Sequence, residues 1–177
     1  MKKRTRRTLV VSIILHALLL VIVYIFQSMI FPYLRLTGLT PLLMPIVSTG
    51  VAVYEGRDAG GIMGIFAGIF CDVSLNEPVG VFTVLLTIMG LVIGTLADTV
   101  ITRGFVTFFL SCVAVLTVSA LTQMLPLAFL KDVPIQPLMS VAIQQTIYSL
   151  LFTLPIWFFV RALGKRAQRV SPSGRPL

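Results

Sequence analysis

Six apolar stretches, separated by short polar breaks and bracketed by basic chain ends, constrain the fold of this chain more than any other feature. A hydrocarbon core about 30 Å thick selects apolar runs of about 20 residues. Lys and Arg beside such runs stay on the cytoplasmic side. Charged residues make up 11% of the chain, against about 25% in a soluble domain. We therefore expect an all-α integral membrane protein, a compact bundle of six transmembrane helices with both termini in the cytoplasm.

Proline, glycine and charged residues mark the breaks between the expected helices. These helices cover residues 9–30, 41–54, 59–73, 79–101, 105–130 and 137–160. The first run is too long for a signal-peptide core, and no small-residue cleavage site follows it. The second and third helices are short, at roughly 22 Å each, so they form either two tilted crossings, which we favour, or a re-entrant hairpin. Residues 1–163 are then one membrane domain, and the polar, proline-rich segment 164–177 is a flexible basic cytoplasmic tail.

The distribution of Lys and Arg supports this topology. With the N-terminus inside, the expected cytoplasmic segments hold twelve basic residues, and the expected outer loops hold two, Arg35 and Lys131. This asymmetry follows the positive-inside rule. The net charge of +8 is therefore expected to face anionic membrane lipid, and we expect no nucleic-acid partner.

One face of the third expected helix is almost free of side chains. At 100° per residue, Gly61, Gly64, Gly68 and Asp72 fall within an arc of about 80°, and Gly60 adjoins them. Small residues let helix backbones approach closely, which favours helix association in lipid. This glycine face (Gly60, Gly61, Gly64 and Gly68) is a candidate partner-packing surface. Packing against another helix of the bundle is the other use of such a face, and it is the one that we favour.

Polar side chains within apolar helices are the second group of candidates. An aspartate such as Asp72 costs about 3 kcal/mol at the centre of a membrane helix. It is either solvated or capping near the outer surface, or it makes a functional or folding contact. The expected topology places it in the outer half of the bilayer with four glutamines, Gln27, Gln123, Gln144 and Gln145. This polar set forms either an outward-facing small-molecule pocket or interhelical hydrogen bonds, worth about 0.6 kcal/mol each.

The sequence offers no catalytic residues and no metal site. It contains a single histidine, His16, and two isolated cysteines in apolar runs, Cys71 and Cys112, without a phosphate loop or clustered acids. General acid–base catalysis and metal binding need several such groups within reach of one another. We therefore expect no enzyme activity and no cofactor, and we interpret His16 as a packing residue.

An ordered set of residues between Gln27 and Gly80 resembles the MreD family of bacterial rod-shape-determining membrane proteins. The set comprises Gln27-Ser28, Phe31-Pro32-Tyr33-Leu34-Arg35, Gly38, Pro41, Glu55-Gly56, Gly60-Gly61, Gly64, Gly68, Asp72 and Pro78-x-Gly80. The later helices, with Gly90 and Gly94, match loosely. The family often has an acid after the proline that opens the second helix. Here Leu42 follows Pro41, so no role is assigned to an acid at that position.

The resemblance implies a non-enzymatic scaffold of the elongation complex in the bacterial cytoplasmic membrane. It implies association with an MreC-like bitopic membrane protein, and indirectly with an MreB-like filament, a RodA-like glycosyltransferase and a class B transpeptidase. It also implies a helix arrangement similar to the substrate-binding components of vitamin transporters. The alternative function is small-molecule uptake, with a pocket among Gln27, Asp72, Gln123 and Gln144.

Overall fold

The computed structural model describes residues 6–30, 41–75, 80–99, 104–130 and 135–170. These ranges contain seven helices and no strand, so the all-helical fold predicted from the sequence is confirmed. The helices are α1 (Arg6–Ile30), α2 (Leu43–Glu55), α3 (Arg57–Leu75), α4 (Val81–Thr99), α5 (Phe105–Leu130), α6 (Ile135–Leu151) and α7 (Thr153–Val170). The expected loops at Arg35 and Lys131, the polar break at residues 76–78, Arg103 and both chain ends lie outside the described residues.

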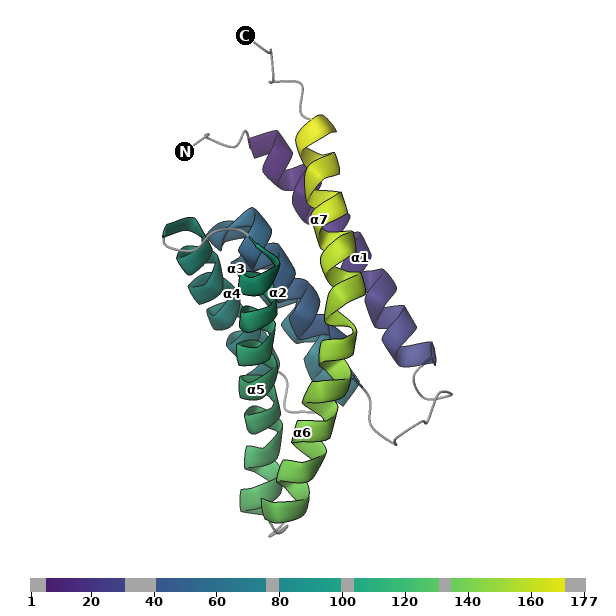
Figure 1. Ribbon diagram of the computed structural model, residues 1–177, viewed down its shortest axis with the longest axis vertical. Coiled ribbons are helices and arrows are strands. Elements are labelled where there is room, and N and C mark those ends of the chain that lie inside the picture. The colour runs from purple at the N-terminus through teal and green to yellow at the C-terminus, as the bar shows by residue number, and fades with distance from the viewer. Residues whose placement is uncertain (1–5, 31–40, 76–79, 100–103, 131–134, 171–177) are drawn as a thin grey trace.

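Figure 1 shows the helices running alternately up and down, with α6 and α7 as one continuous pass. The start of α1 and the end of α7 lie side by side at the same end of the bundle. Among the described residues, three stretches are long and apolar enough to cross a membrane: Val10–Met29, Val81–Thr99 and Phe105–Met124. A fourth results if α6 and α7 count as one bent span. The fold is thus compatible with a multi-pass membrane protein.

The sixth expected helix is broken, which the sequence analysis did not predict. Met139–Leu151 and Thr153–Gly164 meet at an angle of 45°. Pro155 has no N–H for the Leu151 carbonyl, and a proline ring crowds the carbonyl four residues earlier, so a bend here has a local cause. The Phe152 N–H donates to the Ser149 carbonyl at 3.1 Å, one residue short of the α-helical partner. Beyond the bend, α7 continues to Val170, so the segment predicted as a flexible tail begins as helix.

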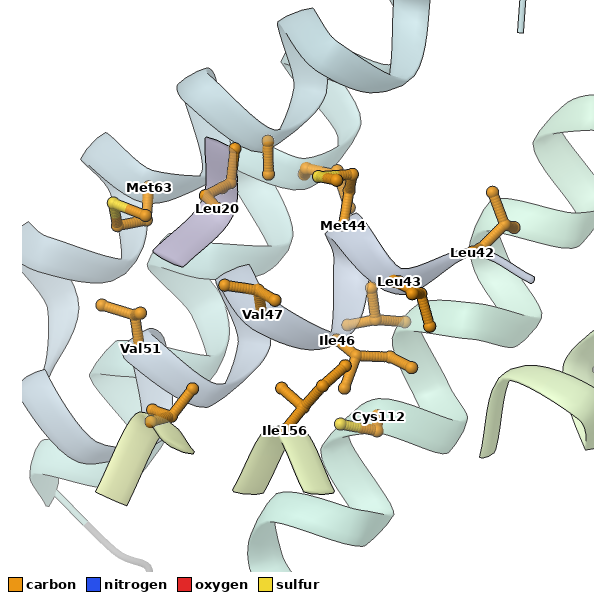
Figure 2. Packing of buried hydrophobic residues seen from close by; sticks show 14 of the residues in the cluster. Leu20, Leu42, Leu43, Met44, Ile46, Val47, Val51, Met63, Cys112 and Ile156 are labelled. Atoms are coloured by element: carbon orange, nitrogen blue, oxygen red, sulfur yellow. The ribbon is translucent and has the colours of Figure 1, made fainter. Parts of the chain in front are cut away.

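Helix α2 lies at the centre of the bundle. Every residue from Leu43 to Val53 is buried, and α2 contacts α1, α3, α4, α5 and α7. Figure 2 shows its side chains among residues of the surrounding helices, namely Leu20, Met63, Cys112 and Ile156. Because α2 is enclosed by protein along almost its whole length, its 13 residues do not need the length of a lipid-exposed span.

The outer faces of the surrounding helices are apolar. Exposed large side chains include Ile14 and Leu18 on α1, Val84 and Ile88 on α4, and Phe158 on α7. Monomeric soluble proteins rarely expose apolar surface of this extent. These faces suit contact with lipid chains or with the helices of other membrane proteins.

Candidate functional site

The glycine face of α3 packs against α4. A Cβ at Gly60 would lie 2.7 Å from the Gly90 carbonyl oxygen, and a Cβ at Gly64 or Gly68 would collide with the backbone of Leu86 or Thr83. Of the two uses considered from the sequence, packing within the bundle is the one that this geometry supports, because within the described chain α4 already occupies the face. Small residues favour both uses equally, so the sequence alone does not separate them.

Helix α4 has its own small residues at this contact. Gly90 faces the Gly60 carbonyl, and a Cβ at Gly94 would lie 2.6 Å from the Arg57 Cα. Gly61 differs from the others, because a Cβ there would meet only the Leu91 side chain, at 2.7 Å from Cδ2. A leucine can rotate away, whereas backbone cannot. The α3–α4 contact therefore depends on glycine at most of these positions and less strictly at Gly61.

Asp72, near the end of α3, caps the start of α4. Its side chain is 3% exposed. The Gly80 N–H donates to Oδ2 at 2.9 Å and the Phe82 N–H to Oδ1 at 2.8 Å. The Thr83 hydroxyl also donates to Oδ2, at 2.7 Å. A carboxylate here satisfies N–H groups that have no partner within their own helix and suits the positive end of the helix dipole. Of the roles considered from the sequence, capping is the one that the geometry supports.

Asp98, near the end of α4, makes the reciprocal contact and was missed by the sequence analysis. Its Oδ2 accepts a hydrogen bond from the Arg57 N–H, at the start of α3, at 3.1 Å. Gly56, between α2 and α3, has a φ of 94°, and a Cβ there would lie 2.7 Å from the Asp98 carboxylate. Each helix of the α3–α4 pair thus ends in an acid that caps the other. The sequence does carry a signal for this arrangement, because each of the two neighbouring glycine-rich helices has an aspartate near its C-terminal end.

The buried start of α2 is capped by side chains from α1 and α6. The Leu42 N–H donates to Ser149 Oγ at 2.9 Å, and the Leu43 N–H donates to Gln27 Oε1 at 3.2 Å. Ser149 in turn donates to the Gln145 carbonyl at 2.7 Å. Leucine at the N-cap has no side-chain acceptor of its own, so these long-range contacts replace a local cap.

The predicted polar set is therefore only partly brought together. Gln27 and Gln145 are both buried. The Gln27 side chain caps α2, whereas Gln145 is linked to this cap through its backbone carbonyl, which accepts the hydrogen bond from Ser149. Gln144 is exposed, because neighbouring residues of a helix point about 100° apart. Gln123 on α5 is half-buried, and its Nε2 has no hydrogen-bond partner among the described residues. No hydrogen bond joins Asp72 or Gln144 to Gln27 within the described ranges.

His16 connects α1 to α7. The ring is fully buried, with Nδ1 2.8 Å from the Ser12 carbonyl oxygen and Nε2 3.4 Å from the Val160 carbonyl oxygen. Nδ1 also lies 3.3 Å from the Ser12 hydroxyl, and the contact with Val160 links two helices. This position fits the packing role expected from the sequence.

Two hollows on the molecule are lined almost entirely by apolar side chains. One of about 210 Å³ lies between α5 and α6, and one of about 560 Å³ lies on α7. None of the five polar candidate residues lines either hollow. In the part of the chain that the structure describes, no three His, Cys, Asp or Glu side chains are grouped as a metal site would need.

Comparison with protein-family models, curated proteins and solved structures finds no match for this chain. The features of this chain that bear on function are the filled centre of the bundle, the reciprocal caps of α3 and α4, and the apolar outer faces.

Proposed function

We propose that this protein is a non-enzymatic scaffold subunit of the bacterial rod-shape complex. In this role it binds an MreC-like bitopic membrane protein and couples an MreB-like filament to a RodA-like glycosyltransferase and a class B transpeptidase of lateral peptidoglycan synthesis. We further propose six crossings of the cytoplasmic membrane with both termini inside, which the charge distribution supports.

The observation that carries the proposal is the filled centre of the bundle. A small-molecule site needs a concave pocket lined by a few convergent polar groups. Here the centre is occupied by α2, whose residues Leu43 to Val53 are all buried. The interior groups Gln27, Asp72 and Ser149 hydrogen-bond helix starts. What remains available for function is the outer surface, which favours a role in holding partners over small-molecule uptake.

Several of the described residues that resemble the MreD family hold helices of the bundle together. Gln27 caps α2, Gly64 and Gly68 contact α4, and Asp72 accepts a hydrogen bond from Gly80. Gly80 has a φ of 108°, a conformation that favours glycine. Asp72 and Gly80 thus contact each other, and the other described members of the set stabilise the packing of α2, α3 and α4. Phe31 to Arg35, Gly38 and Pro78 lie outside the described residues.

Depletion of the chain in its own rod-shaped host tests this function. We expect the rods to become spheres while nutrient uptake is unchanged, because the filament and the wall synthase lose their connection. A plasmid copy should restore the rods, and a copy with Gly68→Leu, which breaks the α3–α4 contact, should not. Complete depletion without a change of cell shape would exclude the scaffold, and a lost uptake activity would favour the alternative function.

A further inference from the structure

The outer face of α7 contains an apolar hollow just beyond the bend that separates it from α6. The hollow has a volume of about 560 Å³ and is lined by Leu154, Pro155, Trp157, Phe158, Phe159 and Ala162. Phe158 and Phe159 are 71% and 61% exposed. A surface of this kind within a membrane helix suits a hydrocarbon chain.

The Arg161 guanidinium lies beside Trp157, one of the residues that line this hollow. The Arg161 guanidinium carbon lies 5.0 Å from the centre of the Trp157 ring, which is a cation–π geometry. Arg161 is exposed, and this ring is the contact that the structure records for it among the described residues. Its five N–H donors are therefore available to a ligand.

Trp157 holds this arrangement in place. Its indole N–H donates to the Tyr54 hydroxyl, and its ring packs edge-on against Phe105 at 5.2 Å between centroids. Trp and Tyr concentrate at the membrane–water interface. Arg161 follows Leu154 by about 10 Å along the helix axis, so the cation and the hollow are spaced as a headgroup and the upper part of an acyl chain are.

The sequence at this end of α7 has more cations than acids, and the acid next to α7 is Glu55, whose Oε1 would lie 3.0 Å from a Cβ at Gly164. Lys165 and Arg169 follow Arg161 at intervals of four residues along α7. Helix α1, which begins with Arg6-Arg7, lies beside α7 at this end (Figure 1). Basic residues at a membrane surface attract anionic lipids.

We propose that Arg161 and the α7 hollow form a binding site for an anionic phospholipid. This lipid belongs to the membrane leaflet that contains the C-terminal end of α7. An acyl chain occupies the hollow, and the headgroup phosphate accepts hydrogen bonds from the Arg161 guanidinium, a group whose planar fork matches phosphate. The site is independent of the proposed scaffold role, because it requires only that α7 lies in a membrane.

Tryptophan fluorescence measures lipid binding at this site, because Trp157 is the single tryptophan of the chain. The full chain is reconstituted in phosphatidylcholine vesicles that contain either brominated phosphatidylglycerol or brominated phosphatidylcholine at the same fraction. Bromine quenches tryptophan only at short range, so quenching measures which lipid occupies the hollow. We expect phosphatidylglycerol to bind about five times more strongly, which corresponds to about 1 kcal/mol for one basic residue near the surface.

Two variants separate a site from diffuse attraction. Arg161→Gln should reduce the preference to about one, whereas Arg57→Gln, which removes an exposed cation at the start of α3, should keep it. Equal quenching by the two lipids in the native chain would overturn the proposal and needs no variant. An equal loss of preference in both variants would also overturn it, because the attraction would then belong to the overall charge.

Discussion

Gly68→Ala tests the close contact of α3 and α4 with the smallest possible change. A Cβ at this position would lie 2.7 Å from the Phe82 carbonyl oxygen and from the Thr83 nitrogen, and closer still to the Thr83 Cα. Non-bonded atoms normally keep about 3.5–4.0 Å, so the two helices must separate by about 1 Å. Overpacking of this kind costs about 1–3 kcal/mol, and the upper part of the range applies because the obstructing atoms are backbone.

The same substitution also has a favourable part. Alanine stabilises a helix over glycine by about 1 kcal/mol, so the expected net loss for Gly68→Ala is about 2 kcal/mol. Gly61→Ala is the matched control, because its Cβ meets only the Leu91 side chain. A changed leucine rotamer costs about 0.5–1.5 kcal/mol, so this variant should be nearly neutral.

The assay for this pair is unfolding by sodium dodecyl sulfate of the purified protein in mild detergent micelles, followed by circular dichroism. The two variants differ in one position on the same helix and carry the same new side chain, so helix propensity cancels between them. A Gly68→Ala protein that is as stable as Gly61→Ala would refute the backbone contact and the α3–α4 geometry derived from it.

Three further predictions follow from the helix caps and the charge distribution. Asp72→Asn should lower the unfolding free energy by about 1 kcal/mol, the value of a modest hydrogen bond. The variant should still bind its partners. If it folds normally but loses the complex, Asp72 contacts a partner instead. Ser149→Ala should cost about 1–3 kcal/mol because it leaves the buried Leu42 N–H without an acceptor, whereas Ser48→Ala, which removes only a bond within α2, should cost less in the same assay. A cysteine at Gln168 should be labelled only from the cytoplasm and one at Asn76 only from outside; labelling of Gln168 from outside would contradict the topology.

The positions of the helices could be read from the sequence because the breaks are chemically distinct. Gly56 separates α2 from α3, and the charged Glu55, Arg57 and Asp58 flank it. Such residues are rare in the middle of an apolar helix. The bend at Phe152 could not be predicted in the same way. Pro155 is tolerated within membrane helices, so its presence alone does not show whether a helix continues or breaks.

The central position of α2 was also not predictable. Its short apolar sequence is equally suited to a tilted crossing and to a re-entrant hairpin, and burial depends on the helices that surround it. The cap at its start joins Leu42 to Ser149, which are 107 residues apart in the chain. Nothing in the spacing of these two residues indicates a contact.

The candidate polar residues show the same limit. The choice between Gln144 and Gln145 for the interior depends on how α6 is rotated about its axis, and both residues are equally polar. Asp72 was identified from its cost in a membrane, but its hydrogen-bond donors lie at the start of the next helix. Its counterpart Asp98 is not distinctive in the sequence, because it lies close to the polar segment between two helices, where acids are common.

Affinity purification of the chain from native membranes of its host, followed by identification of the proteins that accompany it, tests the proposed function most directly. The account predicts an MreC-like bitopic membrane protein in the purified complex, retained with the Gly61→Ala variant and lost with Gly68→Leu. A chain that purifies without protein partners, and with a stoichiometric small molecule, would contradict the scaffold function and support uptake.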